Sequence, residues 1–138
     1  MRVTSGSAGD IITINADYYT FYTSSIGYLP LALKMLNNPK LRAKGFMGWQ
    51  QAPNDHYGML FIHDHEHPQS YWMHTVPFDL DCLGFDKNNN LVEIMHLDAL
   101  SKTSRGFSVP VKYVVEVRGG WCKDKGLKGG EKLVIRKL

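Results

Sequence analysis

The chain has only two cysteines and lacks long apolar runs, repeats and low-complexity segments. Cys82 and Cys122 are far apart and have no zinc-binding spacing, so we expect two reduced thiols. No apolar run approaches the roughly 20 residues that span a bilayer. The start, MRVTSGSAGD, lacks the apolar region of a secretory signal. We therefore expect no membrane association and a cytoplasmic protein, or a virion protein if a phage encodes it.

Length and composition indicate one ordinary globular domain. The 138 residues are 43% hydrophobic and 21% charged, which is enough to form a core without disulfides. The net charge of +3 is uneven. Eight basic and three acidic side chains give residues 112–138 a charge of +5, so the rest carries −2. Aromatic residues that could stack on bases are not interleaved with these lysines, which makes nucleic-acid binding an unfavoured interpretation.

Short apolar runs separated by turn residues predict a mainly β fold. The predicted strands cover residues 11–15, 18–24, 57–63, 70–75, 80–85, 91–97, 111–117 and 131–137. Residues 31–36 (LALKML) fit a strand or a helix equally well. The sequence DKNNN (86–90) predicts a tight turn, and residues 118–130 predict a short turn or helical hook.

The best helix signals lie in the segment NNPKLRAKGF. Asn38 can cap the helix, Pro39 suits its first position, and Gly45 can end it in a left-handed conformation. These signals predict one short helix near residues 39–44. The predicted fold is a compact sandwich or barrel of about eight short strands with this helix; the alternative is an α+β domain.

Four ordered blocks resemble one family. They are AKGFMGW (43–49), GMLFIH (58–63), YWMHTVPFDLDCLGFD (71–86) and KYVVEVRGGW…KGLKGGEKLVI (112–135). This pattern resembles domain of unknown function 192, also called uncharacterised protein family 0127, over roughly residues 31–136. Residues 1–30 would then be an N-terminal extension with edge strands. The resemblance implies a small, mainly β domain found in bacteria, archaea and phages, and it implies no function.

The chain departs from the family pattern where a polar cluster is expected. The family's WMKNT is WMHTV here, which places His74, Thr75 and Val76 at the last three positions. The family's proline before its Leu-Asp pair is replaced by Asp79. A binding site shared by the family would therefore be remodelled in this member.

The segment IHDHEHPQSYWMH raises the question of a metal site. On an extended strand His63, His65 and His67 share one face, about 7 Å apart, and could bind a divalent transition metal. A His-x-His strand is also how a cupin metal site begins, although the later ligands of such a site are missing here. The resemblance places residues 64–69 in a variable loop, which favours solvated histidines over a metal.

A second candidate site consists of polar residues within apolar segments: Trp72, Thr75, Asp81 and Glu116. Asp79 and Asp81 point to one strand face, and we expect Asp81 to hydrogen-bond the backbone. Glu116 lies within an apolar strand, so it must face solvent or find a partner. A solvent-facing or rim position is the simpler expectation for it. These residues could form a small-ligand pocket.

The favoured functional hypothesis is a non-catalytic binding or assembly module that recognises a protein or a copy of itself. Tyrosine is enriched at interfaces, so Tyr18, Tyr19, Phe21 and Tyr22 are the predicted interface residues. In a phage such a module would be a structural component of the particle. No cofactor is expected in this interpretation. The alternatives are small-ligand binding or catalysis, and a metal-dependent enzyme with a cupin-like histidine site.

Overall fold

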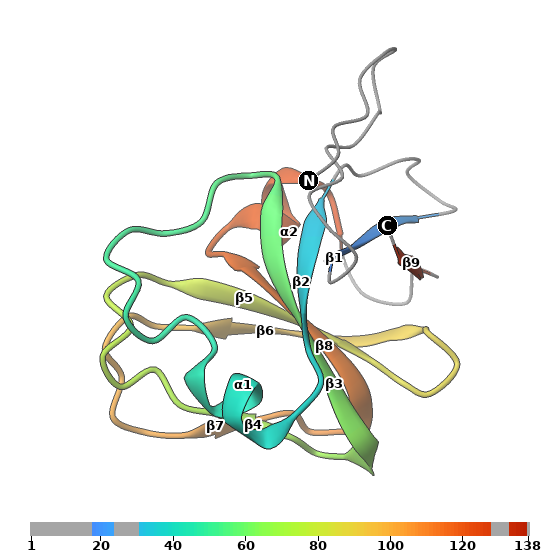
Figure 1. Cartoon of the computed structure of the whole chain (residues 1–138), viewed down its shortest axis with the longest axis horizontal. Helices are drawn as coiled ribbons and strands as arrows, with labels where there is room; N and C mark the ends of the chain where they lie inside the picture. The colour runs from blue at the N-terminus through green and yellow to red at the C-terminus, as the bar shows by residue number, and fades with distance from the viewer. Residues whose placement is uncertain (1–17, 24–30, 128–132, 138) are drawn as a thin grey trace.

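A computed structural model describes the backbone of residues 18–23, 31–127 and 133–137, and the side chains of residues 31–127. Its elements are shown in Figure 1. In chain order they are β1 (Tyr18–Thr23), β2 (Ala32–Leu36), α1 (Pro39–Lys44), β3 (Tyr57–His67), β4 (Ser70–Tyr71), β5 (Leu80–Phe85), β6 (Leu91–Leu97), β7 (Arg105–Gly106), β8 (Val111–Arg118), α2 (Trp121–Asp124) and β9 (Leu133–Lys137). The predicted strand 11–15 lies outside the described residues.

Seven strands form one sheet in the order β6-β5-β8-β3-β2-β1-β9, while β4 and β7 pair separately. The β2–β3 pair is parallel, and the other pairs are antiparallel. The predicted mainly β class is confirmed, in a sandwich-like α+β form. The strand order is linear, so the described strands do not close into a barrel. Residues 31–36, which the sequence left ambiguous, contain strand β2.

Helix α1 has the bounds that its local signals predict. The Asn38 side chain accepts a hydrogen bond from the Leu41 amide at 2.9 Å, and Pro39 occupies the first turn. Gly45 ends the helix with a positive φ of 45°, which glycine adopts without steric cost. The helix lies in the crossover that a parallel pair requires, so it is positioned over one face of the sheet. The predicted hook contains a second short helix, α2.

Both faces of the sheet are covered, and each has its own hydrophobic core. One core includes Leu80, Cys82, Val114 and the residue after α1, Phe46; we call this side the α1 face. The other includes Leu83, Phe85, Val115 and Val117 together with Trp121 of α2; we call this side the α2 face. Alternate residues of β5 and β8 therefore enter different cores, because successive side chains of a strand point to opposite faces.

Two predicted segments differ from the structure. Strand β3 continues to His67, so residues 64–67 are strand and not the expected loop. Its far end pairs with the start of β8, His67 opposite Val111, after an irregularity in the register that begins at Ile62. The predicted strand 70–75 is reduced to β4, because the chain turns at Met73, whose carbonyl accepts a hydrogen bond from Val76.

Helices long and apolar enough to cross a membrane are absent from the part of the chain that the structure describes.

Replacing Gly58 with alanine tests the close approach of β3 and β8. The added Cβ would lie 2.8 Å from the Glu116 carbonyl oxygen and 3.1 Å from the side chains of Leu33 and Val117. Relieving this crowding in a packed core should cost about 1–3 kcal/mol of unfolding free energy, measured by urea denaturation. Gly106→Ala is the control, because its nearest contact is an ordinary 3.5 Å. Equal losses for the two variants would contradict the packing described.

Candidate functional site

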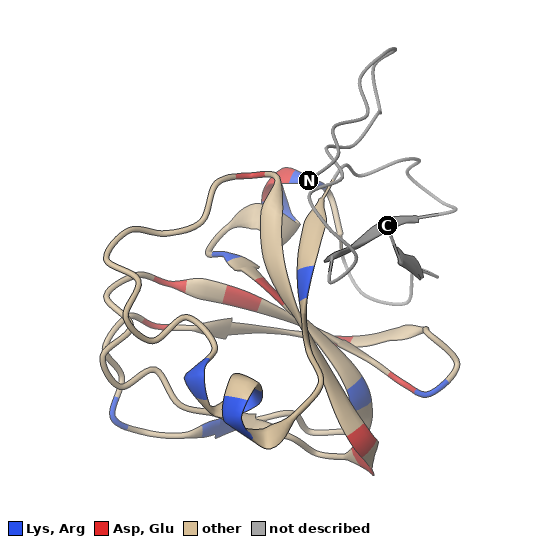
Figure 2. Cartoon of the chain, in the orientation of Figure 1, with Lys and Arg blue, Asp and Glu red and all other residues tan. Residues whose placement is uncertain are grey.

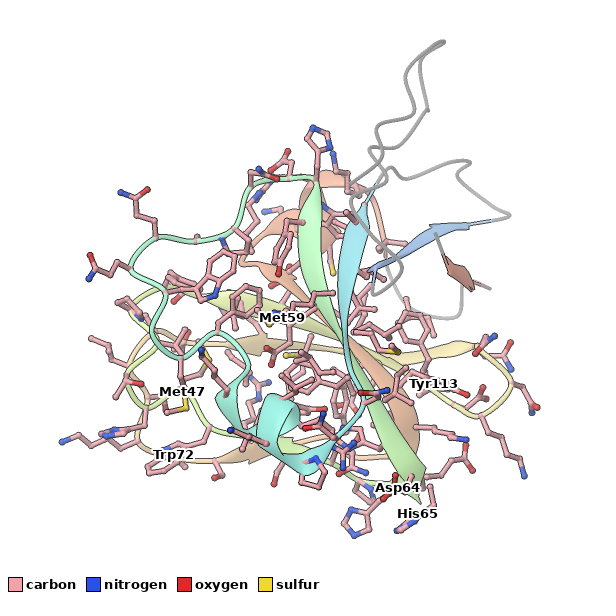
Figure 3. All side chains as sticks on the ribbon, viewed as in Figure 1. Met47, Met59, Asp64, His65, Trp72 and Tyr113 are labelled. Carbon is pink, nitrogen blue, oxygen red and sulfur yellow. The ribbon has the colours of Figure 1, made fainter. Side chains whose placement is uncertain are left out.

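A cavity of about 460 Å³ opens on the α1 face. Its apolar walls include Phe46, Phe61, Met73, Val76 and Leu80. Met47 and Trp72 are on its rim, and Figure 3 shows both at the left of the view, beside α1. The Trp72 residue is 58% exposed. The volume is that of a small-molecule site, and we call it the α1-face cavity.

Glu116 is the buried acid of this cavity. It lies on β8, lines the cavity and is only 4% exposed. The strand register places it opposite Met59 on one side and Cys82 on the other. The expectation of a solvent-facing or rim position is therefore wrong. The reason is that the α1 face of the sheet is covered. The side chains that alternate along β8 therefore point into a hydrophobic core on either face, and Glu116 points into the core on the α1 face.

Within the described part of the chain, the Glu116 carboxylate has one weak hydrogen-bond donor. The Cys82 thiol donates to Glu116 Oε2 at 3.4 Å, and within residues 31–127 no Lys, Arg or His nitrogen lies within ion-pair distance. Burial raises the pKa of Glu116 from 4.5 to about 7, and the Cys82 contact only partly opposes this. Burial and the neighbouring carboxylate also raise the pKa of Cys82, so that thiol stays protonated and donates.

A histidine–tyrosine pair lines the same cavity. His63 Nε2 and the Tyr71 hydroxyl are 2.8 Å apart, and the Tyr71 ring packs edge-on against Phe61 at 5.2 Å between centroids. Burial, with a smaller contribution from the charge of Arg42, lowers the pKa of His63 to about 4. Burial also raises the pKa of Tyr71, and Glu116 adds to the effect. Both side chains are therefore neutral near pH 7.

Two cationic side chains from α1 are part of the lining of the cavity. Arg42 and Lys44 come from the last turn of α1 and line the cavity, and Figure 2 shows blue Lys and Arg positions on this helix. Arg42 Nη1 donates to the Ile62 carbonyl at 2.8 Å, which holds the half-buried guanidinium against the middle of β3. Within residues 31–127, neither cation has a carboxylate within 4.0 Å.

A second polar cluster lies on the α2 face. His96 and Asp81 are direct cross-strand partners, with Nδ1 and Oδ1 2.9 Å apart. The other Asp81 oxygen accepts from the Cys122 amide at 3.1 Å, so Asp81 does bond the backbone and ties α2 to the sheet. The hydrogen bond that His96 donates to Asp81 is the main cause that raises the pKa of His96. Both oxygens of this buried aspartate are thus occupied.

The side chains that lie close enough together to bind one metal ion are not the histidines that the sequence suggested. Within residues 31–127, the set with three ligand atoms inside 4.8 Å of one another is Asp79, His96 and Asp98, all exposed. The predicted ligands His63, His65 and His67 do not form such a set. His63 contacts Tyr71, and His65 is exposed at the end of β3 (Figure 3). Metal binding at these three histidines stays a prediction.

The four predicted ligand-binding residues separate into different places. Trp72 and Glu116 line the α1-face cavity, whereas Asp81 lines a more open hollow of about 590 Å³ on the α2 face. Thr75 is exposed in a turn with φ 69° and lines neither.

The sequence did not indicate Arg42 or Tyr71 as site residues. In the sequence, Arg42 was noticeable only as part of the predicted helix, and Tyr71 only as part of the YWM block that resembles the family.

The predicted interface residues Tyr18, Tyr19, Phe21 and Tyr22 lie on β1, whose backbone pairs with β2 and β9. Their side chains lie outside the described part, so an interface at these four positions stays a prediction.

The fold and cavity define a small, mainly β domain with a covered sheet and a ligand-sized hollow beneath a short helix. The chain belongs to the DUF192 family, described as "Uncharacterized ACR", which matches residues 22–135. This confirms the resemblance seen in the sequence.

Two solved structures are similar to this chain. A Sinorhizobium meliloti 1021 protein, provisionally described as a transcription regulator, is 27% identical with a TM-score of 0.75, over 85% of this chain and 91% of its own. A Novosphingobium aromaticivorans DSM 12444 protein of unknown function is 23% identical with a TM-score of 0.75, over 85% and 83%. The second likeness shows the fold alone. No curated protein matches the chain.

The raised pKa of Glu116 gives stability a definite pH dependence. The folded-state pKa of about 7 exceeds the ordinary 4.5, so the unfolded chain loses this proton first and stability falls as pH rises from 4.5 to 7. The Glu116→Gln variant lacks this loss. The free energy of unfolding of the variant minus that of the wild type should therefore rise by up to roughly 3 kcal/mol between pH 4.5 and pH 8.

Urea denaturation of both proteins across that range measures the difference. The titration of His63, whose pKa is lowered to about 4, has the opposite sign but is common to both proteins and cancels. A stability difference that does not change with pH would show that the Glu116 carboxyl is not desolvated in the folded protein.

Removing the Asp81 carboxylate should loosen α2. Asp81→Ala deletes the bonds to His96 and to the Cys122 amide, and we expect a loss of about 2 kcal/mol in unfolding free energy. Asp98→Ala is the matched control, because the Asp98 side chain is 82% exposed and 3.6 Å from His96. A loss for Asp98→Ala as large as that for Asp81→Ala would argue against the anchoring role.

Proposed function

We propose that this protein is a small-molecule-binding module whose ligand enters the α1-face cavity and contacts Glu116. The observation that carries the proposal is a fully buried carboxylate that lines a ligand-sized cavity and has a thiol as its hydrogen-bond donor. An ionisable group whose pKa is shifted by burial, in a cleft with apolar walls, is the usual signature of a binding site.

Stability alone gives little reason for an acid at this position. Burying a carboxylate without a strong partner costs free energy, and a well-packed apolar side chain would be more stable. The neighbours of Glu116 across the strands, Met59 and Cys82, are such apolar or weakly polar residues. A ligand that supplies the missing hydrogen bonds or charge would give Glu116 a role that packing does not.

Binding is favoured over catalysis by the state of the neighbouring groups. His63 and Tyr71 hydrogen-bond each other, and the raised pKa of Cys82 keeps this thiol from acting as a nucleophile. Small-ligand binding, which was an alternative hypothesis from the sequence, is therefore preferred here to the favoured one, the recognition of a protein or of a copy of itself. The regulator description of the Sinorhizobium meliloti relative is compatible with ligand sensing, but it belongs to that protein.

The other hypotheses from the sequence remain predictions. Self-association or assembly through Tyr18, Tyr19, Phe21 and Tyr22, including a place in a virion, depends on side chains outside the described part. A cupin-like metal enzyme would need His63, His65 and His67 to converge on one ion.

Blocking the cavity tests the proposal. Ala43 lines the α1-face cavity and is exposed on α1, so Ala43→Trp should fill the opening without disturbing the core. Lys40→Trp adds the same ring to the same helix at an exposed residue outside the lining. Both variants and the wild type are screened by ligand-observed NMR against a fragment library of small amines, acids and neutral aromatics.

The expected result is a set of fragments that bind the wild type and Lys40→Trp but lose at least about tenfold in affinity to Ala43→Trp, which is about 1.4 kcal/mol. Thermal denaturation confirms that both variants are folded. The proposal fails if no fragment binds the wild type, or if the fragments that bind are insensitive to Ala43→Trp.

A further inference from the structure

We infer that the ligand of the α1-face cavity is a zwitterion, with an ammonium group held inside near Glu116 and an anionic group held at the opening by Arg42 and Lys44. The inference rests on the proposed function and names the chemical class of its ligand. It depends on the order of charges from the inside of the cavity to its opening.

The inner part of the cavity suits an ammonium group. The buried Glu116 carboxylate lines it together with the buried rings of Phe46 and Phe61, and Tyr71 is also part of the lining. Ring faces attract cations, most strongly in a site shielded from water. An ammonium would also supply the charge partner that Glu116 lacks among the described residues, whereas a carboxylate or phosphate would be repelled there.

The opening suits an anion. Arg42 is fixed by its bond to the Ile62 carbonyl, and this bond uses one of its five N–H donors. The remaining donors are suited to a carboxylate or a phosphate. Lys44 is exposed on the same helix turn and lines the same cavity. His63, which is also part of the lining, is neutral near pH 7 because its pKa is lowered to about 4, so it does not cancel or add charge.

The two ends together exclude molecules with a single charge. A simple cation must pass Arg42 and Lys44, and a simple anion would face Glu116 if it filled the cavity. A molecule with both charges satisfies both ends, and its orientation is then determined by them. An α-amino acid, a betaine and a phosphocholine headgroup share this chemistry and differ in the spacing of the two charges, which a binding panel can distinguish.

The test is calorimetric titration of the full chain with a panel of matched probes. The zwitterions are glycine, glycine betaine, 4-aminobutyrate and phosphocholine. Tetramethylammonium and choline carry only the cation, and acetate and phosphate only the anion. The panel is run on the wild type, Glu116→Gln, Arg42→Gln and Lys102→Gln. The last is the charge-matched control for Arg42→Gln, because Lys102 is exposed and outside the cavity lining.

We expect at least one zwitterion to bind the wild type at least about tenfold more tightly than its single-charge counterparts. Glu116→Gln should weaken that zwitterion by about thirtyfold or more, because it removes one partner of a buried charge pair. Arg42→Gln should weaken it by about tenfold, and Lys102→Gln should have no effect. Near-UV circular dichroism of each variant checks that the fold is retained.

Three results would overturn the inference. A single-charge or neutral probe could bind as tightly as every zwitterion, Glu116→Gln could leave zwitterion binding unchanged, or no zwitterion could bind at all. If fragments still bind the wild type and are blocked by Ala43→Trp, the proposed function stands and only the ligand class is wrong. If no fragment is blocked by Ala43→Trp either, both fail.

Discussion

Strand β8 pairs with both β3 and β5, and this double pairing determines where the polar groups of the protein lie. Its register sets Glu116 opposite Met59 and Cys82, and Val117 opposite Asp81. The two faces are covered by different segments, so residues 114–117 of β8 are buried on both faces. A shift of one residue would exchange the two sets, moving Glu116 to the α2 face and replacing it in the cavity wall with a valine.

The two buried carboxylates of the central strands differ in how they are satisfied. Asp81 has a histidine and a backbone amide as partners, and its role is to hold α2 on the sheet. Among the residues that the structure describes, Glu116 has a thiol as its donor at 3.4 Å, and it lines an open cavity. Because buried polar groups in proteins are nearly always well paired, the pairing of Asp81 fits a structural role, and the poor pairing of Glu116 is the observation on which the proposed binding function rests.

Local signals predicted local structure well. Asn38, Pro39 and Gly45 determine the bounds of α1 through contacts within a few residues, and the apolar runs of β5 and β6 have the predicted bounds. Non-local features were missed. The extension of β3 to His67 depends on pairing with Val111, and the burial of Glu116 depends on a cover over the α1 face. The candidate site was half predicted, since Trp72 and Glu116 line the cavity while Thr75 and Asp81 do not.

By itself, the sequence determined the β class, the short helix and the membership of a family, because turn residues, caps and ordered motifs act over short stretches or as a pattern of letters. Only the tertiary structure decided that Glu116 is buried, that Arg42 and Tyr71 lie around the same cavity, and that His63 contacts Tyr71. These outcomes depend on which distant strands pair and on which segments cover each face of the sheet. The alternation of side chains along a strand is the same whether a face is exposed to water or covered by a second core, so the sequence of the strand does not show which of the two applies.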